Sequence, residues 1–246
     1  MSDLELDRPY KRGDNAPKVK LIQEWLCLHG VQVSTDGDFG PASDAAVKQF
    51  QKQAKLKPDG VVGPKTFAKL IKPMSDALKP IAATGKSLGQ MVVLYAQQHF
   101  RQSPREIGGQ NRGPWVRLYM DGNEGEQWAW CGGFTCFVLK QAAATLEVTL
   151  PIVASFSCDS LAASAKQRKV FLSEASASDR AKLAPGSFFL LRRTPTDWVH
   201  TGIVTNVAAE TIRTIEGNTN DDGSREGYEV CQRIRGYGSK DFILIK

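Results

Sequence analysis

Cys131 differs from the other four cysteines of this 246-residue chain in its neighbouring residues. It lies in the stretch WAWCGGF, residues 128–134, with two tryptophans before it and two glycines after it. Apolar residues recur at helical spacing from this point, which predicts that Cys131 begins a helix. The N-terminus of a helix stabilises a thiolate through its dipole and its free N–H groups. These features predict a nucleophilic thiol with dry walls on one side and open approach on the other.

A cysteine nucleophile requires a base, and His200 is the histidine best placed to supply one. It begins the strand pattern HTGIVTNV, and the next strand carries Glu216 and Asn218. A turn centred at residue 208 places Glu216 opposite His200, whereas a turn centred at residue 209 places Asn218 there. Both residues project to the same face because side chains alternate along a strand. Either is a candidate to orient the imidazole in a triad.

Acyl transfer at a cysteine also requires hydrogen-bond donors for the oxyanion. The backbone N–H of Cys131 is one candidate, and the side chain of Gln127, four residues upstream, is another. A zinc site is disfavoured, because the chain has no C-x-x-C pair and its three histidines lie far apart in sequence. Acyl transfer by such a triad needs no metal or organic cofactor, and we expect none. We interpret four other cysteines as structural: Cys27, Cys136, Cys158 and Cys231. We expect His99 at the surface or at a helix end.

The elements around these candidates are typical of an α+β domain. Helical patterns cover residues 87–100, 131–146 and 158–169, and residues 101–127 are predicted to form a long loop. Short strand patterns follow with turn signals between them: GSFFLLRR, HTGIVTNV, ETIRTIEGN, YEVCQRIR and DFILIK. Helices followed by a run of antiparallel strands favour the α+β class.

The first part of the chain contains an internal repeat and no nucleophile constellation. DGDFGPASDAAVKQF and DGVVGPKTFAKL both read Asp-Gly-x-x-Gly-Pro before a helical pattern, beginning at residues 36 and 59. Proline at the first helical position costs nothing, because its missing N–H would have no partner there. We predict a three-helix binding domain over residues 1–72. A linker over residues 73–87 follows, because its prolines and small residues interrupt the periodicity.

Residues 10–72 resemble the peptidoglycan-binding domain 1 family, whose pattern is DG-x-FG, AV-x-x-FQ and L-x-x-DG-x-x-G-x-x-T-x-x-x-L. The chain carries the matching residues at these positions: Asp36, Gly37, Phe39, Gly40, Ala46, Val47, Phe50, Gln51, Leu56, Asp59, Gly60, Gly63, Thr66 and Leu70. Most of these residues are structural in type. The resemblance therefore implies a ligand class, peptidoglycan, and no list of contacts.

Residues 88–246 resemble the CHAP (cysteine, histidine-dependent amidohydrolase/peptidase) family through WCGGFTCFVLKQAA, APGSFFLLRR and HTGIVTNVAAETIRTIEGNTND in this order. The resemblance implies a papain-like α+β fold with an antiparallel sheet. It also implies Cys131 as nucleophile, His200 as general base and acid, and Glu216 as the orienting residue. The family often has Pro-Gly-Asp before the histidine strand, where this chain has Pro-Gly-Ser at 185–187.

Both resemblances point to one substrate. They imply a peptidoglycan hydrolase that cleaves an amide of the stem peptide or its junction with muramic acid, as an amidase or an endopeptidase. Two alternatives remain: a non-catalytic wall-binding protein, and a transferase that uses the same triad with an amine as acceptor.

The charge pattern and the N-terminus bear on partners and location. The net charge of +6 is spread thinly, so nucleic acid ranks last as a partner. We expect no membrane insertion, since no apolar run approaches the length of a membrane span. We also expect a monomer. The N-terminus has no apolar signal segment. We expect synthesis in the cytoplasm and action in the periplasm or cell wall. Delivery would be through a holin, as for a phage endolysin, or by a secretion machine, as for an antibacterial toxin with an immunity protein.

Overall fold

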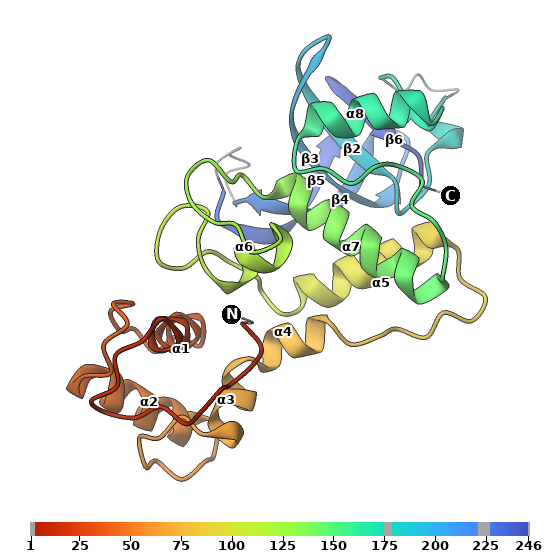
Figure 1. Ribbon diagram of the computed structural model, residues 1–246. Coiled ribbons are helices and arrows are strands. Elements are labelled where there is room, and N and C mark those ends of the chain that lie inside the picture. Colours follow the sequence, from red (N-terminus) through yellow and green to blue (C-terminus); the bar gives the residue numbers. More distant parts are fainter. Residues whose placement is uncertain (1–2, 175–178, 221–226, 246) are drawn as a thin grey trace.

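The computed structural model describes residues 3–174, 179–220 and 227–245. A small helical half at the N-terminus packs against a larger half that combines helices with a sheet (Figure 1). The predicted α+β class is confirmed. Among the described residues, no helix has both the length and the apolar character needed to cross a membrane.

The N-terminal half is built on α1 (Pro17–Leu28), α2 (Pro41–Gln53) and α3 (Pro64–Leu70), each with proline in its first turn. Two buried glutamines explain the sequence repeat. Gln23 donates to Oδ1 of Asp36 and accepts from the N–H of Gly37, and Gln51 bonds Asp59 and the next glycine in the same way. Each Asp-Gly turn is thus closed by an amide from a helix, and the repeat is a repeated hydrogen-bond pattern.

The predicted linker, residues 73–87, begins in a helix. This helix, α4 (Lys72–Ala77), follows directly on α3. The carbonyl oxygen of Ala77 accepts hydrogen bonds from the side chains of Gln98 and Gln141, which belong to the larger half. The start of this segment is therefore bonded to the second half of the molecule.

The larger half contains four helices in its described residues: α5 (Leu88–Phe100), α6 (Pro114–Tyr119), α7 (Cys131–Leu146) and α8 (Cys158–Gln167). A short 3-10 helix covers Asp179–Lys182. α5 and α7 pack together, and α7 contacts strands β3 and β4. α5 begins with a capping box in which Ser87 and Gln90 bond each other's backbone N–H groups.

The sheet is antiparallel, and its described strands are ordered β1-β6-β2-β3-β4-β5. Their bounds are β1 (Phe171–Leu172), β2 (Phe188–Thr194), β3 (Asp197–Val207), β4 (Thr211–Thr219), β5 (Glu229–Gly236) and β6 (Lys240–Ile243). Five of these were predicted, and β1 was missed because two residues give no period. The predicted strand DFILIK ends at Ile243, and its last residue, 246, lies outside the described part.

The prediction of an uninterrupted loop over residues 101–127 was wrong, because this segment contains α6. Gly113 precedes the helix with a φ of 106°, a value that favours glycine, and Pro114 occupies the first turn. Gly113-Pro114 thus begins a helix in the same way as the Gly-Pro pairs before α2 and α3.

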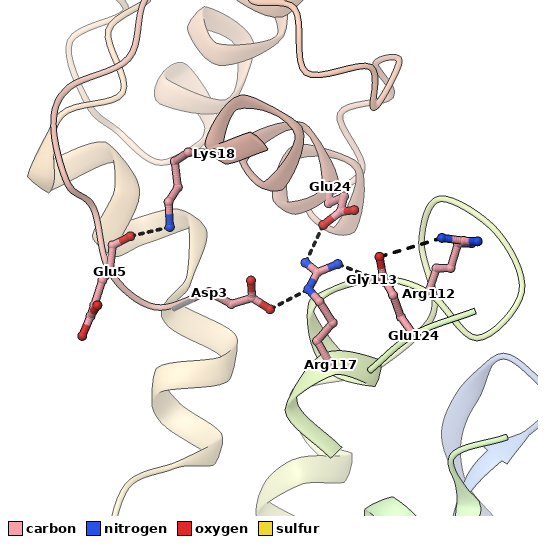
Figure 2. Close-up of polar contacts among 8 residues, drawn as sticks. All are labelled: Asp3, Glu5, Lys18, Glu24, Arg112, Gly113, Arg117 and Glu124. Atoms are coloured by element: carbon pink, nitrogen blue, oxygen red, sulfur yellow. Dashed lines mark hydrogen bonds and ion pairs between the residues drawn. The ribbon is translucent and has the colours of Figure 1, made fainter. Parts of the chain in front are cut away.

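The two halves meet at a seam between α1 and α6. Trp25 of α1 and Trp115 of α6 make an edge-to-face contact with ring centroids 6.3 Å apart. Arg117 of α6 lies beside them and pairs with three carboxylates, those of Asp3, Glu24 and Glu124, at 2.9, 2.7 and 2.7 Å (Figure 2). One guanidinium therefore joins the N-terminal segment, α1 and the loop that leads to Cys131.

Candidate active site

Cys131 occupies the first position of α7, as the sequence predicted. The residue before it, Trp130, makes no side-chain cap, so the first N–H groups of the helix have no such acceptor within the described residues. Backbone from two other segments packs against the first turn. A Cβ on Gly132 would lie 2.6 Å from the carbonyl oxygen of Phe156, and one on Gly133 would lie 2.6 Å from that of Tyr119. Glycine is required at both positions because these two neighbouring segments leave no room for a side chain.

His200 on β3 and Glu216 on β4 are hydrogen-bonded, with His200 Nε2 2.8 Å from Glu216 Oε2. The strand register pairs Ile203 with Ile215, which corresponds to the turn centred at residue 209. Extended to His200, that register points to Asn218 on the backbone. The side chain that reaches the imidazole is nevertheless the diagonal neighbour Glu216, since diagonal pairs on one face lie within reach of long side chains.

Glu216 is fully buried, and its carboxylate is held by hydrogen bonds from three side chains. Its Oε1 accepts from Thr214 Oγ1 at 2.5 Å and from Arg235 Nε at 2.5 Å, and its Oε2 also accepts from Arg235 Nη2 at 2.6 Å. Arg235 belongs to β5, and its guanidinium lies 5.4 Å from the centroid of the Phe189 ring. This bidentate contact fixes the plane of the carboxylate, so its second oxygen faces His200.

The position of Gly202 on β3 accommodates that carboxylate. A Cβ at this position would lie 2.7 Å from Cγ of Glu216 and 2.8 Å from the ring of Phe189. Gly202 and His200 share one face of the strand, because they are two residues apart. The glycine therefore leaves the space through which Glu216 crosses to the imidazole.

Charge stabilisation in this cluster follows from its contacts. Burial alone opposes ionisation of Glu216, but the hydrogen bonds from Arg235 and His200 lower its pKa to about 2. Burial alone lowers the pKa of His200, while its contacts with Cys131 and Glu216 raise it to about 9. Since an ionised carboxylate only accepts hydrogen bonds, Nε2 of His200 carries a proton and Nδ1 is the nitrogen available to Cys131.

Cys131 is stabilised as a thiolate. The interaction with Cys158 is the largest of the effects that lower the pKa of Cys131 well below its usual value. The nearby His200 and the backbone N–H of Thr201 act in the same direction, and burial opposes them. His200 Nδ1 makes no conventional hydrogen bond among the described residues. We interpret Cys131 and His200 as an ion pair in close contact.

A pocket of about 200 Å³ has Cys131 in its wall. Cys158, Trp198 and Asn218 are among its lining residues. Asn218 is 1% exposed, has a φ of 55°, and its Oδ1 has no hydrogen-bond partner among the described residues. A buried amide oxygen without a partner, at the wall of a pocket, is suited to accept an N–H from a ligand.

The other candidates lie elsewhere. Gln127 is exposed and is not among the residues that line this pocket, so its role as an oxyanion donor stays a prediction. Trp130 is fully buried and Trp128 is partly buried. His99 is at the end of α5 as expected, but it is buried rather than at the surface. It bonds Tyr119 and Gln141, and burial lowers its pKa to about 4.

Three side chains that contact the candidate residues were missed by sequence reasoning: Thr214, Cys158 and Arg235. Thr214 stands two residues before Glu216 on one strand face, and that spacing was a usable signal. Arg235 gave no signal, because its apolar neighbour Ile234 is the residue that the pattern would bury, although it is 66% exposed, and the register of the strand was unknown. The interpretation of Cys158 as structural missed its position beside Cys131, which depends on how the segment after α7 folds back.

Residues 15–70 match the protein family described as "Putative peptidoglycan binding domain", which confirms that part of the sequence-based identification. Zinc D-Ala-D-Ala carboxypeptidase of Streptomyces albus G is 41% identical over 61 residues, 25% of this chain and 24% of that protein. An uncharacterised protein from the bpoA1 3' region of Kitasatospora aureofaciens is 52% identical over 70 residues, 28% of this chain and 59% of that protein.

Carboxy-terminal processing protease CtpA of Bacillus subtilis (strain 168) is 35% identical over 68 residues, 28% of this chain and 15% of that protein. The chain therefore spans less than two thirds of each of these relatives. What is shared is a module of about the length of the N-terminal half. The resemblance of residues 88–246 to the CHAP family stays a prediction.

Proposed function

We propose that the chain is a peptidoglycan hydrolase that cleaves an amide bond through Cys131, His200 and Glu216. The observation that carries the proposal is the arrangement of a thiol at a helix N-terminus, a buried His-Glu pair and a pocket with Cys131 in its wall. The match of residues 15–70 to a peptidoglycan-binding family supplies the substrate class. Two relatives that share this stretch are named as a carboxypeptidase and a protease.

The proposed reaction is acyl transfer in two stages. The thiolate of Cys131 attacks the amide carbonyl, and N–H groups at the start of α7 bind the oxyanion. His200, held by Glu216, gives its Nδ1 proton to the leaving amine, and the C–N bond breaks to leave a thioester on Cys131. The same nitrogen then takes a proton from water, which hydrolyses the thioester and frees Cys131. Asn218 Oδ1 would accept an N–H of the substrate and so align the scissile amide.

The N-terminal half would hold the wall close to this site. Its three helices are docked through Arg117 and the two tryptophans of the seam. A docked module presents its ligand in a restricted orientation, whereas a flexible tether only raises the local concentration. We therefore propose that wall binding also sets which strand of the network faces Cys131.

The proposal is tested by digestion of purified peptidoglycan with the wild-type protein and with Cys131→Ala, followed by mass spectrometry of the released fragments. Wild type should release fragments with a new amine at one defined bond. Bare glycan strands would identify an amidase, and shortened stems or split cross-links an endopeptidase. Products in which another amine has replaced water would identify a transferase.

Cys136→Ala is the matched control, because Cys136 belongs to the same helix and donates to the carbonyl oxygen of Ser155 instead of facing the pocket. It should digest as wild type does. Binding of both proteins to the sacculus with no release of fragments would overturn the enzyme and favour a wall-binding protein.

Delivery and partners remain proposals that follow from this function. We propose action in the periplasm or cell wall after export through a holin or a secretion machine. In the second case a cognate immunity protein would protect the producing cell. A pull-down with Cys131→Ala from a producing strain, compared with a strain that lacks the neighbouring genes, tests for such a partner.

A further inference from the structure

Cys158 begins α8 as Cys131 begins α7, and the two cysteines line one pocket. The segment before α8 is packed on the first turns of α7. The carbonyl oxygen of Phe156 leaves no room for a side chain on Gly132, and that of Ser155 accepts from Cys136 Sγ at 3.4 Å. Cys158 follows two residues after Phe156, so the packed backbone of this segment holds Cys158 beside Cys131.

Cys131 and Cys158 line one pocket, in contact close enough that each has the largest effect on the pKa of the other. This contact and burial raise the pKa of Cys158 well above its usual value, so it stays a thiol beside a thiolate. Both residues are nearly buried, at 5% and 7% exposure, and reach solvent through the pocket of about 200 Å³. One reactive and one protonated sulfur thus share a small, open cavity.

Two other cysteines are arranged differently. Cys27 donates to the carbonyl oxygen of Val33, and Cys136 donates to that of Ser155. Burial raises the pKa of Cys136 to about 11. Cys136 is also five positions after Cys131 on one helix, where side chains three and four apart are the ones that face each other. Neither residue is therefore placed to exchange with Cys131.

We propose that Cys131 and Cys158 are a redox pair, in which a peroxide oxidises Cys131 and Cys158 resolves it to a reversible disulfide that switches off the site. The inference rests on the proposed function in one respect: the switched site is the proposed nucleophile. The pair chemistry itself depends only on the two sulfurs.

The chemistry balances with one hydrogen peroxide. The Cys131 thiolate attacks a peroxide oxygen, so an S–O bond forms as the O–O bond breaks, and the departing hydroxide takes up a proton as water. Cys158 then attacks the sulfenic sulfur while its proton goes to the leaving oxygen. The S–S bond forms, the S–O bond breaks and a second water leaves. The two sulfurs together lose the two electrons that the peroxide gains.

Disulfide formation protects as well as inhibits. A sulfenic acid without a resolving thiol is oxidised further to a sulfinic acid, which thiol reductants do not reverse. Because Cys158 lines the same pocket as Cys131, its condensation with the sulfenic acid competes with that further oxidation. The pair therefore allows recovery of Cys131 after oxidation.

The experiment treats the reduced full-length chain with hydrogen peroxide, alkylates the remaining thiols, and maps the peptides by mass spectrometry. Hydrolysis of peptidoglycan is measured before treatment, after it, and after addition of dithiothreitol. We expect a cross-linked peptide that joins residues 131 and 158, the loss of two hydrogens in the intact mass, and loss of activity that dithiothreitol restores.

Two substitutions separate the roles of Cys158. Cys158→Ser keeps a donor beside Cys131 but has no sulfur, so excess peroxide should carry Cys131 past the sulfenic to the sulfinic acid, with an activity loss that dithiothreitol does not restore. Cys158→Ala removes the donor too, and the pH at which Cys131 is alkylated at half its maximal rate should rise relative to Cys158→Ser. Cys136→Ala, the control, should form the same cross-link as wild type.

Each result decides between the two proposals. Absence of a 131–158 cross-link in folded wild type overturns the redox pair and leaves the hydrolase standing, as does a wild type that excess peroxide inactivates as irreversibly as Cys158→Ser. A cross-link in a protein that never cuts peptidoglycan supports the pair and overturns the hydrolase. Wild-type peptide mapping alone decides the pair if the substituted proteins do not fold.

Discussion

Two clusters in this molecule each place an arginine against buried carboxylates, and they differ in which group is shared. At the candidate site one carboxylate, Glu216, is shared by Arg235, Thr214 and His200. At the seam one guanidinium, Arg117, is shared by three carboxylates. The partners of Glu216 lie on three adjacent strands, whereas those of Arg117 lie on segments far apart in sequence.

This difference decides what each cluster does. Neighbouring strands are held together by backbone hydrogen bonds, so the bonds to Glu216 orient side chains on strands that are already paired. The seam has no shared ladder between α1 and α6, so the bonds to Arg117 add attachment. The seam also adjoins a larger cavity, of about 530 Å³, which includes Arg117 and Glu24 in its wall. We expect substitutions in the first cluster to affect rate first, and those in the second to affect stability first.

The largest effect is expected from Glu216→Gln, which keeps the shape and removes the charge. By analogy with removal of the orienting carboxylate from a serine triad, the rate of peptidoglycan cleavage should fall about 10³- to 10⁴-fold. The pKa of His200, about 9 with its present contacts, should fall because Glu216 is among the groups that raise it. The alkaline limb of the pH–rate profile should move down with it, since His200 must donate a proton.

Glu210→Gln is the control, because Glu210 is exposed just before the same strand. It should leave both the rate and the profile unchanged. A rate for Glu216→Gln within twofold of wild type would mean that the carboxylate holds the sheet and takes no part in orienting His200.

Arg235→Gln is expected to have the next largest effect and to act on both rate and stability. Because Glu216 has a pKa of about 2 in the folded chain against the usual 4.5, its charge stabilises the fold above about pH 4.5 and this contribution is lost as the pH falls toward 2. Loss of Arg235 leaves a buried charge with only two partners, at a cost of about 3 kcal/mol.

The pKa of Glu216 should then rise, so that acid unfolding and the acid loss of activity both begin at a higher pH. Urea unfolding and cleavage rates measured across acid pH test this. Arg235→Lys keeps the charge and loses the fork, and it should lie between wild type and Arg235→Gln. Unchanged acid limits in Arg235→Gln would show that His200 and Thr214 suffice to hold the carboxylate.

At the seam, Arg117→Met should lower the free energy of unfolding by about 2 kcal/mol. The cost is smaller than at Glu216 because Asp3 and Glu124 are each one-fifth exposed and can be rehydrated, which leaves only Glu24 buried without a partner. Burial already raises the pKa of Glu24, which makes protonation an available response. Adding Glu24→Gln should therefore recover part of the loss.

Urea unfolding of both single variants and the double variant measures this coupling, and Arg101→Ala, an exposed arginine, is the control. Additive losses in the double variant would show that Arg117 and Glu24 act independently. That result would remove the reason to regard the seam as a rigid attachment.

The comparison also explains what the sequence could and could not predict. The helix start at Cys131 and the strands of His200 and Glu216 were predicted, because helix starts and alternating strands are local patterns. The choice between Glu216 and Asn218 was not, since it depends on a register and on a diagonal contact that Gly202 permits. Arg235 and Cys158 depend on strand order and on packing of the segment before α8. Arg117 lies in a segment predicted as loop, and its partners come from distant parts of the chain.

The smallest expected effect on stability is at an exposed ion pair. Arg193 and Asp197 pair at the edge of the pocket, 2.5 Å apart, with side chains 61% and 26% exposed. Exposed pairs contribute about 0–1 kcal/mol, because water and salt screen the charges. Arg193→Ala should therefore leave urea unfolding almost unchanged. Any change in cleavage would then report contact with the substrate, and an anionic stem peptide should show it as a raised KM with little change in kcat. A lower kcat at unchanged KM would instead place Arg193 among the groups that hold β3, and would join this exposed pair to the Glu216 cluster.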